Sequence, residues 1–138
     1  MSSLLFRTLI CVLSVFSNQF FTHIGVEDGL SQVTITGIVQ DAEGQMWFGT
    51  ENGLNRFDGF DVSVYYHDDG NPSSISSDKI HSLFVDSKGR LWVSTGAGID
   101  LFDKETDSFT HVTSNAFRCL SIFERSDGVL YFGGGSLL

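Results

Sequence analysis

Short apolar runs alternate with turn signals along most of this chain. The first two runs are residues 35–39 and 46–48, and a second pair follows at 80–85 and 91–93. A four-residue segment joins the two runs of each pair, and this arrangement is typical of a β-hairpin. Because almost no segment shows helical spacing, the pattern predicts an all-β protein.

The turns that join these runs begin with Asp and end with Gly. They run from Asp41 to Gly44 in the first pair and from Asp86 to Gly89 in the second. An Asp side chain can accept hydrogen bonds from the N–H groups of a turn, and Gly adopts positive φ without a clash at Cβ. Both segments therefore fit a type I turn that is closed by a left-handed glycine.

Both hairpins belong to a longer unit that the chain repeats. The Asp, Gly, Trp, Thr and Gly at positions 41, 44, 47, 50 and 53 recur 45 positions later, at 86, 89, 92, 95 and 98. In a weaker third copy Gly128 and Tyr131 follow Gly89 and Trp92 by 39 positions. Arg125 replaces the Asp there, so only Gly128 is expected to support that turn. The residues assigned to the structural repeat are Asp41, Gly44, Trp47, Gly49, Gly53, Asp86, Gly89, Trp92, Gly98, Gly128 and Tyr131.

Each of the first two copies holds two further strands. The first copy has them at 53–57 and 60–66, where Asp58-Gly59 signals a two-residue hairpin, and the second copy at 98–102 and 109–112. Four strands in a repeat of about 40–45 residues are the signature of a β-propeller blade. The sequence therefore predicts a partial β-propeller of about two and a half four-stranded blades. The expected blades are residues 33–66, 78–112 and 117–138.

The composition agrees with a globular domain and excludes one class of partner. The chain has 138 residues, 41% of them hydrophobic and 13% aromatic, which is ample for a folded core. The formal net charge is −9, and the 8 Lys and Arg residues are scattered singly. Nucleic-acid binding depends on clustered basic side chains, so we expect no nucleic-acid partner.

Residues 1–17 match a secretory signal peptide, because Arg7 precedes an apolar run that is followed by small residues. Cleavage there would leave residues 18–138 as the mature chain. The alternative is that the apolar run forms a buried first strand of the fold. After cleavage Cys119 would be the single remaining cysteine, so we expect a small buried hydrophobic residue there rather than a disulfide.

The repeated aromatic and acidic residues are better explained by structure than by chemistry. Trp47, Trp92 and Tyr131 recur at one position of the blade, which favours packing between blades over stacking on a sugar. Asp41 and Asp86 are turn formers first. Glycoside hydrolysis needs two acids that face one bond about 5–10 Å apart, and repeated turn positions lie on separate blades. We therefore predict no catalytic residue.

Metal-ligating groups occur at positions 67–69 (His, Asp, Asp) and at His81. Their spacing fits no known ligand pattern, and the segment from His67 to Pro72 is typical of a solvated loop between blades. The sequence thus predicts neither a metal site nor a cofactor. A ligand would be expected at the loops on one face of the propeller. Those loops are residues 51–52, 96–97 and 67–78.

Two stretches resemble a known family. The run Val-Glu-Asp-Gly-Leu-Ser-Gln at 26–32, followed by the repeat residues of 38–59, resembles the opening of the periplasmic sensor of hybrid two-component systems, which begins with two-component regulator propeller repeats. The likeness continues through residues 66–77 and 86–93. The chain departs from the family pattern at Ser94, where Gly is usual, at Ile99-Asp100, where Leu-Asn is usual, and throughout the third copy.

This resemblance implies a sensory role. Sensors of that family carry a signal peptide, two seven-bladed propellers, a β-sandwich domain, one membrane span and cytoplasmic histidine kinase, receiver and DNA-binding parts. They bind glycan breakdown products and form homodimers. The resemblance thus implies a seven-bladed type of propeller, a periplasmic location and an oligosaccharide ligand. No kinase motif occurs in these residues, so we expect an N-terminal fragment that has no enzymatic activity and meets the membrane only through a downstream span.

Two other functions stay open on the residues alone. The first is a secreted propeller piece that works by itself as a binding module and assembles with copies or with a partner. The second is an extracellular enzyme of propeller form that acts on polysaccharide. The sensor interpretation is favoured over both, and the enzyme is favoured least.

Overall fold

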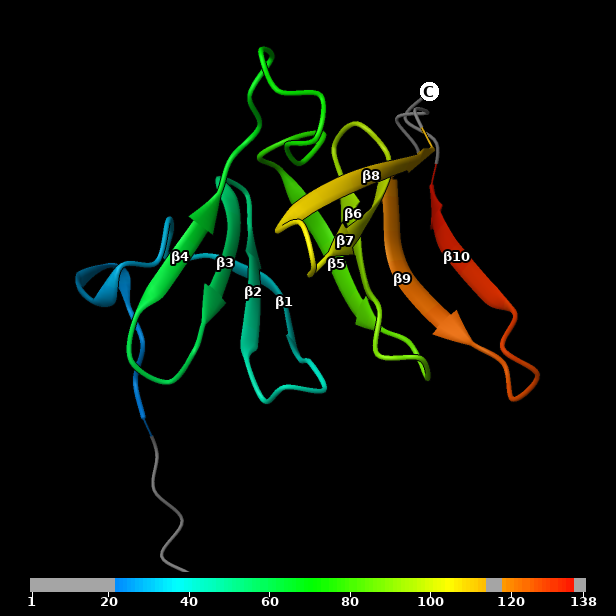
Figure 1. The fold of residues 1–138 in the computed structure, drawn as a ribbon, viewed down its shortest axis with the longest axis horizontal. Helices are drawn as coiled ribbons and strands as arrows, with labels where there is room; N and C mark the ends of the chain where they lie inside the picture. The colour runs from blue at the N-terminus through cyan, green and yellow to red at the C-terminus, as the bar shows by residue number, and fades with distance from the viewer. Residues whose placement is uncertain (1–21, 114–117, 136–138) are drawn as a thin grey trace, which may run out of the picture.

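A computed structural model of the chain describes residues 22–113 and 118–135. They form antiparallel sheets that lie side by side (Figure 1). The predicted signal peptide, residues 1–17, lies outside the described residues. Within the described part of the chain, no helix is long and apolar enough to span a membrane.

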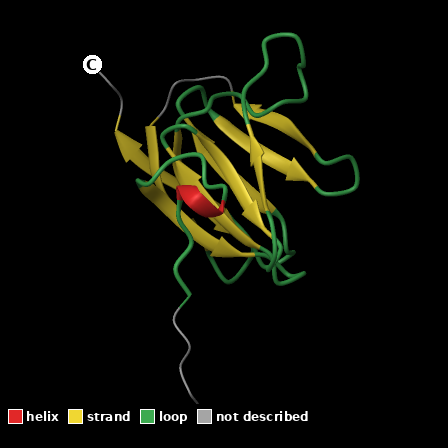
Figure 2. Ribbon diagram, turned by 90° about the vertical axis from the view of Figure 1, so that its left-hand side faces the viewer, coloured by secondary structure: helices red, strands yellow, loops and turns green. Residues whose placement is uncertain are grey.

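The first sheet has four strands in the order of the sequence. They are β1 (Ile35–Gln40), β2 (Met46–Thr50), β3 (Gly53–Phe57) and β4 (Val62–Tyr65). A short 3-10 helix, η1 (Val26–Asp28), precedes this sheet and lies over one of its faces (Figure 2).

The second sheet repeats this topology. Its strands are β5 (Ile80–Val85), β6 (Leu91–Thr95), β7 (Ile99–Asp103) and β8 (Ser108–Thr113). A hairpin of β9 (Arg118–Glu124) and β10 (Leu130–Gly135) follows. The predicted all-β fold with four-stranded propeller-like blades is confirmed.

The first strands of the three sheets are neighbours. β5 contacts β1 on one side and β9 on the other (Figure 1). Equivalent strands that meet in this way are expected when successive blades are arranged around a common axis.

Apolar side chains from facing sheets hold the blades together. Between the first and second sheets the buried cluster is Trp47, Leu54, Ile75, Ile80, Leu91, Val93 and Phe109. Between the second sheet and the last hairpin it is Trp92, Ile99 and Cys119, with Phe84, Leu101, Ile122, Leu130 and Phe132 packed against them. Cys119 is fully buried, as expected for a small hydrophobic residue.

The Asp-to-Gly turns form as the sequence predicts. The Oδ1 atom of Asp41 accepts hydrogen bonds from the backbone N–H of Glu43 (3.0 Å) and of Gln45 (2.9 Å). Gly44 closes this turn with φ of 87°, and Gly89 closes the second with φ of 75°. Asp86 accepts the equivalent bonds from the N–H groups of Lys88 and Arg90.

The second carboxylate oxygen of each turn Asp binds the repeated tryptophan. Trp47 Nε1 donates to Asp41 Oδ2 at 2.8 Å, and Trp92 Nε1 donates to Asp86 Oδ2 at 2.9 Å. A buried indole N–H usually needs such a partner. The six-residue spacing from Asp to Trp therefore links each turn to the core between the blades.

The third turn corrects one prediction. Besides Gly128, Asp127 supports it, because its Oδ1 accepts a hydrogen bond from the N–H of Val129 at 3.2 Å. Arg125 Nη1 donates to the hydroxyl of Tyr131 at 2.9 Å, so the donor and acceptor roles are exchanged relative to the Asp–Trp pairs. Tyr131 is 48% exposed, unlike Trp47 and Trp92, since no described sheet covers that face.

The connection between β3 and β4 also differs from its prediction. It is a four-residue turn over residues 58–61 rather than a two-residue hairpin at Asp58-Gly59, and β4 is shorter than the predicted strand 60–66. Asp58 causes the difference, because its Oδ1 accepts hydrogen bonds from the N–H of Phe60 and of Asp61, both at 2.9 Å. These bonds hold residues 60 and 61 in the turn, with the Phe60 side chain 91% exposed.

Candidate functional site

The connection between β4 and β5, residues 66–79, is the most elaborate loop of the described chain. It lies at the same end of the sheets as the β2–β3 and β6–β7 turns, opposite the Asp-to-Gly turns (Figure 1). Its shape is set by side chains that bind nearby backbone: Asp68 Oδ1 accepts from the N–H of Gly70 at 2.9 Å, and Asn71 Oδ1 from the N–H of Ser73 at 3.0 Å. Such bonds give a loop a defined conformation.

Both blades anchor this connection. Ile75 is fully buried in the core between them. The carbonyl of Ser73 accepts a hydrogen bond from the N–H of Phe109 on β8 at 2.8 Å, and the carbonyl of Asp78 accepts one from the N–H of Gly53 on β3 at 2.7 Å. The connection is therefore held by both blades, and its Ile75 side chain packs between them.

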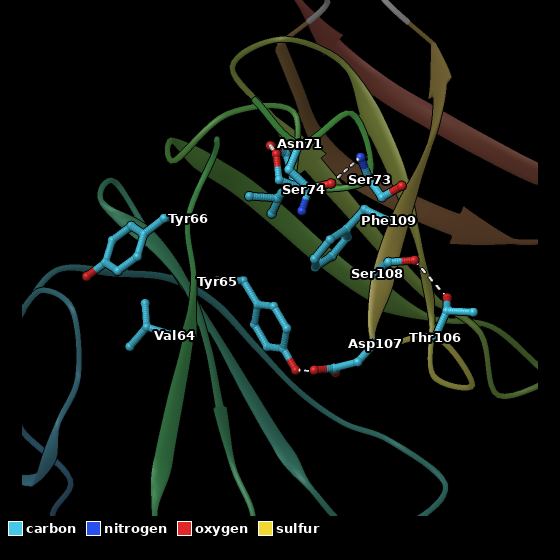
Figure 3. Close-up of a pocket in the computed structure, with 11 residues that line it drawn as sticks. Val64, Tyr65, Tyr66, Asn71, Ser73, Ser74, Thr106, Asp107, Ser108 and Phe109 are labelled. Atoms are coloured by element: carbon cyan, nitrogen blue, oxygen red, sulfur yellow. Dashed lines mark hydrogen bonds between the residues drawn. The ribbon is translucent and has the colours of Figure 1, made fainter. Parts of the chain in front are cut away.

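A hollow of about 540 Å³, here called the rim hollow, lies beside this connection (Figure 3). Aromatic rings, hydroxyls, an amide and a carboxylate line it together. A surface of this kind can stack on an apolar face of a ligand and hydrogen-bond to its hydroxyls. The lining residues are Val64, Tyr65, Tyr66, Asn71, Ser73, Ser74, Ile75, Thr106, Asp107, Ser108 and Phe109.

Asp107, which lines the rim hollow, joins the two blades. Its Oδ1 accepts hydrogen bonds from the hydroxyl of Tyr65 (2.7 Å) and from Arg56 Nη1 (3.0 Å). The Arg56 guanidinium also lies over the rings of Trp47 and Tyr65, 5.6 Å and 5.4 Å from their centroids. Asp107 itself has φ of 52°, a left-handed conformation that Asp tolerates better than most residues.

The Tyr65 hydroxyl is expected to make the fold sensitive to alkaline pH. Burial, and then the hydrogen bond to Asp107, raise the pKa of Tyr65 well above its ordinary value. A folded-state pKa above the unfolded value of about 10 means that stability is lost as pH rises beyond 10. Urea titrations between pH 8 and 11 should show a steeper alkaline loss for the native protein than for Tyr65→Phe. Tyr66→Phe is the matched control, and equal slopes for native and Tyr65→Phe proteins would contradict the expectation.

A second hollow, of about 270 Å³, lies between the β4–β5 connection, the β6–β7 turn and β8. It is lined by His67, Ser76, Ala97, His111 and Thr113 and is called the histidine hollow here. Two of the three predicted ligand loops, 67–78 and 96–97, meet in it. The third does not take part: Glu51 lies 3.4 Å from Lys79 Nζ in an ion pair.

The two histidines of this hollow are held by acceptors. His67 Nδ1 lies 2.8 Å from the carbonyl oxygen of Ile75, and His67 Nε2 lies 3.0 Å from Asp69 Oδ1. Because both partners are acceptors, the doubly protonated ring satisfies both, and the Ile75 carbonyl and Asp69 raise the pKa of His67. His111 Nε2 lies 2.9 Å from the carbonyl oxygen of Ser74. His81 belongs to β5, apart from this hollow, and burial lowers its pKa.

Comparison with known families identifies the repeated unit. The model of the two-component regulator propeller matches residues 29–52 and 74–97. The chain carries two-component regulator propeller repeats. Each match joins the segment that leads into a blade to the first hairpin of that blade, so the connection described above enters the second repeat.

The chain is similar to a histidine kinase and to extracellular domains of two-component systems. It is 43% identical over 60 residues to histidine kinase P4 of Formosa agariphila, a match that spans 44% of this chain and 4% of that protein. Its structure is similar to the extracellular domain of BT3049 of B. thetaiotaomicron, described as a hybrid two-component system, with a TM-score of 0.70 and 27% identity over 80% of this chain and 17% of that one. The extracellular domain of BT4673 from the same bacterium, described as a one-component and as a hybrid two-component system, gives TM-scores of 0.59 and 0.58 over 72% of this chain and 15% of that domain, with 27% and 26% identity.

A largely buried polar cluster recurs in the first two blades, and the sequence interpretation missed it. In the first blade Ser31, Thr50 and Asn55 are joined, with Ser31 Oγ 3.0 Å from Thr50 Oγ1. In the second, Ser76 and Thr95 are joined at 2.7 Å by the same atoms, and the third member is Asp100. Each member lies 45 positions after its counterpart, so the spacing alone could have revealed the cluster.

The remaining repeat glycines occupy crowded positions between or within blades. A Cβ on Gly49 would lie 2.7 Å from Ile80 Cγ2 of the next blade, and a Cβ on Gly98 would lie 2.1 Å from the carbonyl oxygen of Thr113. Gly53, which begins β3, has φ of 115°. These residues and the Asp, Trp and turn-glycine positions build the repeats; of the predicted structural residues none lines either hollow.

Proposed function

We propose that this chain is the ligand-sensing propeller portion of a periplasmic hybrid two-component sensor histidine kinase, and that its ligand is an oligosaccharide. The observation that carries the proposal is the pair of regulator propeller repeats on a fold similar to the extracellular domains of hybrid two-component systems. The relationship to histidine kinase P4 supports a signalling role.

The rim hollow supports the choice of ligand class. Its volume of about 540 Å³ falls within the range of ordinary ligand pockets, about 300–1,000 Å³. Tyr66, which is 48% exposed, supplies an aromatic surface at its edge, and the hydroxyls of Thr106 and Ser108 lie on its opposite side (Figure 3). Sugars present both apolar faces and hydroxyl groups, and this combination of side chains suits them.

In this proposal the chain binds its oligosaccharide and does not hydrolyse it. The candidate acids of the repeats, Asp41 and Asp86, each accept two backbone N–H bonds and one indole N–H bond within their turns. These bonds hold both carboxylates within their turns, and the two turns belong to different blades, whereas a glycosidase needs two acids that face one bond.

Isothermal titration calorimetry with a panel of oligosaccharides tests this proposal. We expect one glycan class to bind the native protein and Tyr66→Ala to weaken that binding about tenfold or more, equivalent to about 1.4 kcal/mol. Ala97→Trp, which fills the histidine hollow, assigns the ligand to that hollow instead if it alone abolishes binding. Phe60→Ala, at the opposite end of the blade, is the control and should bind normally. Absence of binding by any glycan, or hydrolysis of one, would refute the proposal.

A second candidate function is a binding module that assembles from several copies. Large apolar side chains are exposed at both ends of the array of sheets, with Ile38 56% exposed on β1 and Phe123 63% exposed on β9. Native mass spectrometry of the purified chain distinguishes this function, because an assembling module gives a discrete oligomer and the sensor portion does not require one.

A further inference from the structure

The first two blades differ at one buried polar position. Asn55 in the first blade and Asp100 in the second are both fully buried. Both hold the segment that enters their blade: Asn55 Oδ1 accepts a hydrogen bond from the N–H of Ser31 at 2.8 Å, and Asp100 Oδ2 accepts one from the N–H of Ser76 at 2.7 Å. One side-chain oxygen thus has the same role in both blades.

The other side-chain atom has different partners. Asn55 Nδ2 donates to the carbonyl oxygen of Phe48 at 3.1 Å and to Ser31 Oγ at 2.9 Å. The equivalent atom of Asp100, Oδ1, is buried and has no hydrogen-bond partner. In the first sheet Asn55 lies opposite Phe48, and in the second Asp100 lies opposite Val93. The carbonyl oxygen of Val93 is therefore the counterpart of the Phe48 carbonyl that accepts from Asn55 Nδ2.

The surroundings of Asp100 disfavour a carboxylate. β6 contributes no titratable side chain, since residues 91–95 are Leu, Trp, Val, Ser and Thr. The titratable groups that face Asp100 are His111, its partner across β7 and β8, and His67 of the connection. Burial raises the pKa of Asp100, and the bonds from Ser76 and the two histidines only partly oppose this effect. An ionised carboxylate with an unpaired buried oxygen is costly, whereas a protonated one can donate.

We propose that Asp100 is a proton-binding site: in the folded second blade it is the neutral carboxylic acid, and its O–H donates to the carbonyl oxygen of Val93 as the amide of Asn55 does to Phe48. The acid takes up one proton from solvent on folding and releases it on unfolding. Ser76 donates its N–H to Asp100, and His111 lies opposite Asp100 in the sheet. Both residues also line the histidine hollow. Loss of the proton would therefore place a negative charge beside that hollow.

The proposal fixes the sign of a pH effect. A carboxyl that stays protonated in the folded state above its unfolded pKa of about 3.9 stabilises the fold most at or below that pH. Stability is then lost as pH rises from about 4 until the folded acid ionises. Asn at the same position donates the same hydrogen bond without binding a proton, so it removes this loss.

Thermal unfolding of the full chain and of Asp100→Asn between pH 4 and 8 tests the inference. The melting temperatures should be nearly equal at pH 4, and Asp100→Asn should exceed the native protein by about 4–8 °C near neutral pH. Asn55→Asp is the matched reciprocal variant and should introduce a second loss of the same sign. A pH-independent difference, or a lower melting temperature for Asp100→Asn at neutral pH, would overturn the proposal.

Infrared spectroscopy gives a direct reading that does not depend on a folded variant. At pH 6 the carboxyl groups of ordinary pKa are ionised, so the native protein should show the C=O stretch of one protonated carboxylic acid. Unfolding in urea at the same pH should remove this band, and Asp100→Asn should lack it. A native spectrum without the band would show that Asp100 is ionised and would refute the site even if Asp100→Asn fails to fold.

Discussion

Replacing Trp47 with alanine is expected to lower the free energy of unfolding by about 3–5 kcal/mol, the usual range for a buried aromatic side chain. Trp47 is 1% exposed in the core between the first two blades. Its ring packs against Tyr65 and Phe102, with centroid distances of 5.7 Å and 4.8 Å. Its removal also leaves Asp41 Oδ2 without the indole donor. Packing and the turn are therefore weakened together.

Urea unfolding followed by circular dichroism measures this change. Tyr131→Ala is the matched control, because Tyr131 occupies the same position of the repeat but is 48% exposed. We expect it to cost less than about 1 kcal/mol, as is usual for exposed positions. A typical domain is stable by only about 5–15 kcal/mol, so loss of the cooperative transition in Trp47→Ala alone is also consistent with the expectation. Equal losses of unfolding free energy in the two variants would show that burial between blades is not the reason why an aromatic residue recurs at this position.

The spacing of the repeat predicted the hairpins because the repeated turn residues act within their own blade. Asp41 and Gly44 shape a turn whose partners lie two to four residues away, and such local bonds follow from residue type and order. The link from Asp41 to Trp47 was not predicted, although both positions were known, because it depends on the direction of a side chain that leaves the strand. The four-residue turn at 58–61 was missed because Asp58-Gly59 is the usual signal of a two-residue hairpin, whereas Asp58 Oδ1 binds the N–H groups of Phe60 and Asp61.

The candidate site was predictable only as a set of loops. Alternation of hairpins places residues 67–78 and 96–97 at one end of the sheets, and the structure brings them together in the histidine hollow. The rim hollow depends on contacts between blades, such as the bond from Tyr65 to Asp107 across 42 positions of the chain. Tyr65 does not recur 45 positions later, where the residue is Thr110, so the repeat carried no periodic signal for this contact.

One departure from the family pattern has a physical explanation in the next blade. Gly49 packs against Ile80, and the equivalent pair one blade later is Ser94 with Cys119. The register supports this equivalence, because Ile80 lies opposite Thr95, and Cys119 lies opposite Gly134 in the third repeat. The smaller Cys119 leaves room for the Ser94 side chain, whose hydroxyl donates to the carbonyl oxygen of Cys119 at 2.9 Å. The residue at the position of Gly49 or Ser94 should therefore vary together with the residue that it meets on the first strand of the next blade.

Gly49→Ser is accordingly expected to destabilise the fold by about 1–3 kcal/mol, the usual cost of overpacking a close-packed interior. A Cβ there would lie 2.7 Å from Ile80 Cγ2 and 3.0 Å from Thr36 Oγ1. Ile80→Cys alone should also destabilise, because it leaves a cavity in the core. In the double variant the serine fills that space, so the combined loss should be smaller than the sum by about 0.5–3 kcal/mol.

A double-mutant cycle measured by urea unfolding gives this coupling energy. Gly135→Ser is the control for the added side chain, because a Cβ at Gly135 meets no atom within 4 Å. It should leave the free energy of unfolding nearly unchanged. Additive losses in the cycle would mean that the two residues act independently, and the serine at position 94 would then need an explanation other than the size of Cys119. A favourable coupling would show that each blade selects its glycine or serine according to the first strand of the blade that follows.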